Sequence, residues 1–262
     1  MKKIQDCHRI VIKVGTSTLA HPTGMLNIRR VEELVKVLAD LKNSGKEIIL
    51  VSSGSIGVGM GKMGLKERPK DTPSKQACAA VGQCELMYIY DKLFSEYNHV
   101  VSQVLLTRDI VEDTQRKENV INTFERLLQM NVIPIVNEND TVSVEEIEFG
   151  DNDTLSAIVG RLTHADLLII LTDIDGLYDK NPHEFSDAKL IREVTSITPE
   201  IRALAEGKGS TLGTGGMITK IAAAEMAGNA GFSTVIMNGS KAESMYDLFE
   251  GTPVGTLFLN GR

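Results

Sequence analysis

The sequence predicts an α/β fold with a mostly parallel sheet and helices on both of its faces. Short apolar runs typical of buried strands alternate with longer amphipathic runs typical of helices along most of the 262 residues. The strand-like runs lack strict polar alternation, which is typical of strands covered on both faces. No internal repeat, low-complexity tract or clear linker interrupts the pattern. We therefore expect a single domain, 1–262, made of two lobes.

The strands are predicted from runs rich in Val, Ile and Leu that end at polar or glycine-rich segments. The first run, RIVIKV, leads directly into Gly15, and the run LLIIL is the most apolar of all. A weakly alternating run at 142–149 suggests a surface hairpin. The predicted strands are 9–14, 48–51, 100–106, 132–136, 167–171, 233–237 and 255–259.

The helices are predicted from apolar residues at helical spacing and from capping residues. Asn27 is expected to cap a helix that continues to Leu41 and stops at Gly45, and Asp151 or Asn152 is expected to cap another. The remaining predicted helices cover 74–97, 117–130, 153–162 and 217–227.

Composition excludes several classes of function. The net charge of −7 and the lack of a basic stripe argue against nucleic acid as a partner. No run approaches the roughly 18 apolar residues that a membrane span needs, and polar residues interrupt the N-terminus as a signal peptide. The three cysteines form no Cys-x-x-Cys, and the five histidines show no ligand spacing, so we expect a reducing compartment and no zinc site.

Polar and glycine-rich segments follow four of the predicted strands. They are Gly-Thr-Ser at 15–17, Ser-Ser-Gly-Ser at 52–55, Asn-Glu-Asn-Asp at 137–140 and Thr-Asp at 172–173. Ligands of parallel α/β sheets bind beyond the carboxyl ends of the strands. Each loop alone is an ordinary polar loop, but together they predict a ligand site at this edge.

The usual phosphate-binding motifs are absent. There is no Gly-x-x-x-x-Gly-Lys-Ser/Thr, and the Gly-x-Gly-x-x-Gly formed by Gly59, Gly61 and Gly64 begins eight residues after Val51 rather than at a strand end. We expect these glycines to permit close packing or a flexible turn.

Two lysines stand where burial is costly. Lys13 lies inside an apolar strand, and Lys220 lies in the first turns of a helix opened by Thr-Gly-Gly. Each lysine either extends its ammonium group to water or pairs with an anion. For Lys220 the helix N-terminus favours a bound phosphate as that anion. The acidic and amide residues of Gly-Asp-Asn-Asp at 150–153 exceed what one cap needs, so they could orient lysines or hold a substrate ammonium.

Taken together, these segments closely resemble the glutamate 5-kinases of the amino-acid kinase superfamily. The resemblance is carried, in order, by VIKVGTSTL at 11–19, VSSGSIGVG at 51–59, NEND at 137–140, GDNDTLSA at 150–157, LTDIDGLY at 171–178 and GTGGMITK at 213–220. It implies a three-layer α/β/α sandwich, with an acceptor-binding lobe at about 1–165 and a nucleotide-binding lobe at about 166–262.

The resemblance also implies site residues. Lys13, Lys220 and Asp153 would be catalytic, with Asp153 organising the two lysines. Glutamate would be held by Ser53, Gly54, Asp140 and Asn152. The nucleotide would be held by Lys13, Thr172, Asp173, Thr214, Gly215, Gly216, Met217, Ile218, Thr219 and Lys220.

The activity implied is ATP-dependent phosphorylation of the γ-carboxylate of L-glutamate with Mg²⁺, the first step of proline biosynthesis, in the cytoplasm. Feedback inhibition by proline and self-association into a homo-oligomer are further expectations. N-acetylglutamate kinase and a non-catalytic amino-acid sensor are the alternatives, and the carboxylate of Asp140, suited to a free ammonium, favours glutamate. Many members of this family continue into a C-terminal PUA domain, which we expect this chain to lack. Within the motifs, Ser55 stands where a small residue such as Ala is expected.

Overall fold

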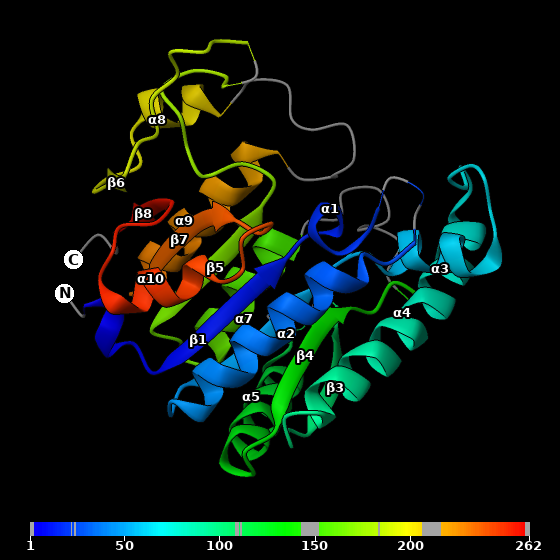
Figure 1. Cartoon of the computed structure of the whole chain (residues 1–262). Coiled ribbons are helices and arrows are strands. Elements are labelled where there is room, and N and C mark those ends of the chain that lie inside the picture. Colours follow the sequence, from blue (N-terminus) through cyan, green and yellow to red (C-terminus); the bar gives the residue numbers. More distant parts are fainter. Residues whose placement is uncertain are drawn as a thin grey trace.

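The structure is a computed structural model that describes residues 3–21, 23, 25–107, 110, 112–142, 152–182, 184–205 and 216–259. Within these residues the strands form one sheet in the order β3-β4-β2-β1-β5-β7-β8-β6, with helices on both sides (Figure 1). The predicted mostly parallel α/β fold is confirmed, because β8 pairs antiparallel with β7 while the other pairs are parallel.

The bounds of the elements follow the predicted runs closely. The strands are β1 Arg9–Val14, β2 Glu47–Ser52, β3 Val101–Leu106, β4 Ile133–Glu138, β5 Leu167–Thr172, β6 Glu193–Val194, β7 Ser233–Asn238 and β8 Thr256–Phe258. The helices are η1 Ile4–Asp6, α1 Thr16–Leu19, α2 Ile28–Asn43, α3 Ser55–Met63, α4 Thr72–Ser95, α5 Thr114–Gln129, α7 Asn152–Leu162, α8 Pro199–Leu204, α9 Met217–Ala230 and α10 Ser244–Glu250.

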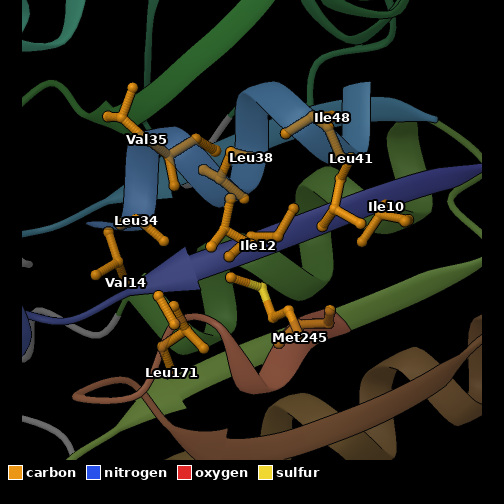
Figure 2. Close-up of a cluster of buried hydrophobic side chains, with 14 of the residues drawn as sticks. Ile10, Ile12, Val14, Leu34, Val35, Leu38, Leu41, Ile48, Leu171 and Met245 are labelled. Carbon is orange, nitrogen blue, oxygen red and sulfur yellow. The ribbon is translucent and has the colours of Figure 1, made fainter. Parts of the chain in front are cut away.

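Two hydrophobic layers cover the two faces of the sheet. Ile10, Ile12 and Val14 of β1 pack with side chains of α2, α4 and α10, as Figure 2 shows for α2 and for Met245 of α10. The alternate residue Val11 faces the other layer, which α5, α7 and α9 cover. Because side chains alternate along a strand, Lys13 shares the face of Val11 and points towards α7 and α9. The expected three-layer sandwich is therefore confirmed.

The topology changes direction at β1. The chain builds β2, β4 and β3 on one side of β1 and β5 and β7 on the other. Open α/β sheets bind ligands at such a point, beyond the carboxyl ends of the strands. The loops after β1 and β2 also meet here, since a Cβ added to Gly54 would lie 3.4 Å from Oγ1 of Thr16.

Local capping residues act as the sequence predicts at α2. The Asn27 side chain accepts a hydrogen bond from the backbone N–H of Arg30, and Gly45 beyond the C-terminus has a φ of 95°. Of the suggested hairpin at 142–149, residues 143–149 lie outside the described residues. The sequence did not predict α1, α3, β6, α8 or α10, which are mostly short.

The glycine-spaced segment forms α3 and packs tightly on α4. A Cβ on Gly59 would lie 1.9 Å from the carbonyl oxygen of Cys78, and one on Gly82 would lie 1.7 Å from that of Ser55. Close packing, one of the two roles predicted for these glycines, is confirmed for Gly59. Across the described part of the chain, no helix combines the length and apolar character needed to cross a bilayer.

Candidate active site

A buried carboxylate joins the two lysines that the sequence singles out. Nζ of Lys13 lies 2.7 Å from Oδ1 of Asp153, and Nζ of Lys220 lies 3.0 Å from Oδ2 of the same residue. Asp153 is 0% exposed, Lys13 7% and Lys220 6%. The lysines come from β1 and α9 and the acid from the first turn of α7, so the fold brings together groups far apart in sequence.

This geometry decides whether each lysine extends its ammonium group to water or pairs with an anion. An ammonium group that extends to water would be exposed, so that reading is wrong for Lys13 and Lys220. Their anionic partner is a carboxylate of the protein itself, which no nearby sequence position supplies. The three groups Lys13, Lys220 and Asp153 together carry one net positive charge, which an anionic ligand would complement.

Several groups stabilise the ionised form of Asp153. Burial raises the pKa of this carboxyl, but the charges and hydrogen bonds of Lys13 and Lys220 outweigh burial and hold the pKa below its usual range. The Thr219 hydroxyl lies 2.9 Å from Oδ2, and the position of Asp153 at the N-terminus of α7 also favours a negative charge.

The neighbouring residue, Asn152, faces a different set of groups. Its amide nitrogen donates to the backbone carbonyl of Ser52 at 3.1 Å and to Oδ1 of Asn137 at 2.8 Å. Asn152 is the first residue of α7 and its side chain points to β2 and β4, so the expectation that it caps the helix is wrong. Asp151, the other candidate cap, lies outside the described residues.

The loop after β4 meets the loop after β2. Oγ of Ser55 donates to Oδ2 of Asp140 at 2.8 Å, and burial raises the pKa of this carboxyl although the hydrogen bond from Ser55 opposes the shift. Ser53 is half-buried and its backbone N–H donates to the carbonyl of Val14. Gly54 has a φ of 98°, a conformation that favours glycine.

Apart from Lys13, the described residues that are predicted to hold a nucleotide lie at two places. Thr172 ends β5, beside β1, and its hydroxyl donates to Asp173 at 3.2 Å. At the start of α9, Thr219 contacts the carbonyl of Gly216, while the Met217 side chain packs on the core and Ile218 is 51% exposed. Thr214 and Gly215 lie outside the described residues.

Three residues of this site were given no role of their own from the sequence. Ser55, treated as a minor departure, contacts Asp140 directly. Asn137 is buried and joins Asn152 to Gln83 of α4. The polar run 137–140 after a strand was a signal for Asn137, whereas no local signal marks Gln83 within a long helix.

The family model described as the amino acid kinase family matches residues 8–238 of this chain. A protein from Clostridium perfringens named "Glutamate 5-kinase" is 53% identical over 98% of this chain and 97% of its own length. A protein of the same name from Listeria innocua is 54% identical over 100% of this chain and 96% of its own length. The chain belongs to the glutamate 5-kinases of the amino acid kinase family.

Solved structures of other kinases share the fold. An isopentenyl phosphate kinase superposes with a TM-score of 0.66 at 15% identity, covering 96% of this chain and 100% of that one. A carbamate kinase from Giardia lamblia, described as bound to AMP-PNP, gives a TM-score of 0.65 at 18% identity, covering 97% of this chain and 99% of that one. At such identities the likeness supports the amino acid kinase fold and no more.

The site offers no dedicated cage for a metal ion in its described part. No group of three or more His, Cys, Asp or Glu side chains there is arranged to hold one. Both oxygens of the Asp153 carboxylate face lysines. This donor set suits Mg²⁺ only where phosphate oxygens and water supply most of the ligands.

Proposed function

We propose that this chain transfers the γ-phosphoryl group of ATP to the γ-carboxylate of L-glutamate, the first step of proline biosynthesis. The observation that carries the proposal is the pair of buried lysines on one carboxylate, directly beside the amide of Asn152. The relatives named glutamate 5-kinase support the same activity. The first turn of α7 would then separate two subsites, with residue 153 facing the phosphates and residue 152 facing the acceptor.

The acceptor needs no general base. A glutamate side chain has an ordinary pKa near 4.3 and is ionised at neutral pH. A carboxylate oxygen forms the new bond to the γ-phosphorus, the bond from that phosphorus to the β-phosphate bridging oxygen breaks, and ADP leaves. The product is γ-glutamyl phosphate, an acyl phosphate. The protein's task is to align two anions and to neutralise charge.

Lys13 and Lys220 supply that neutralisation. We assign Lys13 to the nucleotide phosphates and Lys220 to the transferred group, with Asp153 holding both ammonium groups rather than acting as a base. Mg²⁺ bound to the β- and γ-phosphates would neutralise further charge, and we assign it no protein ligand. Gly216 and Thr219, with Thr214 and Gly215, would cradle the phosphates at the start of α9, and Thr172 and Asp173 would line the nucleotide pocket.

Asp140 favours glutamate over an N-acetylated acceptor. A free α-ammonium pairs with a carboxylate, whereas an acetyl group needs an apolar pocket and no acid. Asp140 contacts Ser55 on the acceptor side, close to Ser53 and Gly54. The sensor alternative is disfavoured because Lys13, Asp153 and Lys220 are all present and joined.

We also propose the two lobes that the resemblance implies. The acceptor residues come from segments within about 1–165, and most nucleotide residues come from about 166–262, with β1 and β5 joining the two parts in one sheet. We also propose a cytoplasmic location, which fits the absence of a disulfide among the three cysteines, all within the described residues. Inhibition by proline and self-association stay predictions.

The decisive experiment traps the acyl phosphate with hydroxylamine in separate reactions with ATP, Mg²⁺ and glutamate, N-acetylglutamate or aspartate. We expect hydroxamate from glutamate at a rate far above the other two. A faster reaction with N-acetylglutamate would assign the chain to that acceptor, and ATP-independent binding of glutamate without hydroxamate would favour the sensor.

A further inference from the structure

Three side-chain amides form a hydrogen-bonded series that ends at the acceptor side of the site. The amide nitrogen of Asn152 donates to Oδ1 of Asn137 at 2.8 Å, and the amide nitrogen of Asn137 donates to Oε1 of Gln83 at 2.9 Å. The three residues come from α7, β4 and α4. Asn137 is 3% exposed, so the middle of the series is shielded from water.

A backbone carbonyl fixes the direction of every bond in this series. The carbonyl of Ser52 can only accept, so the group of Asn152 that lies 3.1 Å from it is the NH₂ group. The same NH₂ group faces Asn137, which must therefore present its oxygen, and Asn137 in turn presents its NH₂ group to the oxygen of Gln83. Reversing one amide would place two donors or two acceptors against each other.

This polarity determines what Asn152 offers to a ligand. Both hydrogens of its NH₂ group are used by Ser52 and Asn137, so its carbonyl oxygen is the atom left for a substrate. A carbonyl oxygen binds a donor such as an ammonium group and repels a carboxylate. Asp140 supplies a second acceptor from the neighbouring loop, where it accepts from Ser55, three residues after Ser52.

The helix that carries Gln83 is packed closely against this part of the site. The preceding residue, Gly82, packs against the backbone of Ser55 with no room for a side chain. One and two turns further along the same face of α4, Leu86 and Tyr90 are buried, and the Tyr90 hydroxyl lies 2.9 Å from that of Ser52. The helix is therefore fixed to the same strand end that carries the Ser52 carbonyl.

We propose that Gln83 is a positioning residue that makes the acceptor site select a free α-ammonium group. It does so by accepting from Asn137, which supports the polarity that the Ser52 carbonyl sets and leaves the carbonyl oxygen of Asn152 for the substrate. The inference rests on the proposed phosphorylation of glutamate and names the group that the site recognises. Glutarate, which is glutamate without its amino group, is the ligand that separates recognition of the ammonium from recognition of the two carboxylates.

The test replaces Gln83 by Met, which removes the acceptor, by Lys, which presents donors, and by Glu, whose ionised carboxylate still accepts. For Gln83→Met and Gln83→Lys we expect the KM for glutamate to rise about tenfold, equivalent to about 1.4 kcal/mol. The KM for ATP and the inhibition constant of glutarate should stay within about twofold of wild type, a limit equivalent to about 0.4 kcal/mol. Gln83→Glu should retain the wild-type KM for glutamate.

Gln129→Met makes the same chemical change at an exposed position of α5 and serves as the control. Circular dichroism and ATP affinity show whether each variant is folded. Any of three results would overturn the inference. The KM for glutamate could be unchanged in Gln83→Met and Gln83→Lys, or these variants could lose affinity for glutarate as much as for glutamate. The third is a Gln83→Glu variant whose KM for glutamate rises as much as that of Gln83→Met. Absence of hydroxamate from glutamate in the wild-type protein would instead overturn the proposed function.

Discussion

Replacing Asp153 by Asn removes the charge that holds two buried ammonium groups together. The substitution keeps the size of the side chain and removes the carboxylate that Lys13 and Lys220, 7% and 6% exposed, share. An opposite-charge pair 4 Å apart is worth about 4 kcal/mol at an effective dielectric constant near 20, and both contacts here are shorter. Breaking a buried pair by removing one partner costs about 3–5 kcal/mol.

We therefore expect Asp153→Asn to lower the free energy of unfolding by about 3–5 kcal/mol at pH 7, a large part of the 5–15 kcal/mol typical of a domain. Urea unfolding followed by circular dichroism measures this difference. Asp187→Asn is the matched control, because it removes a carboxylate that also pairs with a lysine, Lys180, but is 74% exposed. Exposed pairs contribute little, so that variant should unfold as the wild type does.

The pH dependence gives the same prediction a second readout. The pKa of Asp153 in the folded state lies below the value of about 3.9 expected in the unfolded chain. Its contribution is therefore complete above about pH 4 and is lost as the pH falls towards the folded-state pKa. The gap in stability between wild type and Asp153→Asn should narrow on acidification. A variant as stable as wild type at pH 7, or a gap independent of pH, would refute the reasoning.

Three further changes test other parts of the account. Gly82→Ala would place a Cβ 1.7 Å from the backbone oxygen of Ser55 and should lower the free energy of unfolding in urea by about 1–3 kcal/mol. Gly57→Ala is the control, because its Cβ would meet only a methyl group at 3.6 Å, and it should not destabilise the protein. Equal effects of the two substitutions would contradict the packing of α3 on α4. Burial raises the pKa of Asp140, so the KM for glutamate should rise on acidification at a higher pH than an ordinary aspartate would cause. Asp140→Asn should raise KM and remove that pH dependence, and a pH profile that survives in the variant would assign it to another group. Thr219→Val removes a hydroxyl 2.9 Å from the Asp153 carboxylate and should lower the free energy of unfolding by about 1 kcal/mol. No change in unfolding would show that this hydroxyl does not stabilise the ionised Asp153.

The strands and long helices could be predicted because each carries its own signal. Apolar runs of β1, β2 and β5 and the capped amphipathic pattern of α2 are local properties of the sequence, and the structure reproduces them to within a residue or two. By contrast, α3 was missed because its glycines lower helix propensity. It is a helix because close packing on α4 requires those glycines.

The site was predictable as a set of positions and less so as a set of contacts. Lys13 and Lys220 could be singled out because a lysine in an apolar strand or a helix N-terminus is unfavourable alone. Only the resemblance implied that one carboxylate pairs with both lysines, because β1, α7 and α9 meet through tertiary packing. Gln83 could not be found at all, because an amide in a long helix acquires its role only from Asn137 across the interface with β4.

The two ammonium groups at Asp153 are proposed to neutralise phosphate charge during transfer, Lys13 at the nucleotide phosphates and Lys220 at the transferred group. The turnover of Lys220→Met tests this most directly. Hydroxamate formation is measured at saturating ATP and glutamate, with circular dichroism confirming the fold. We expect kcat to fall by about 10²–10³, the loss seen when one group that stabilises transition-state charge is removed. A folded variant with the turnover of the wild type would contradict the account.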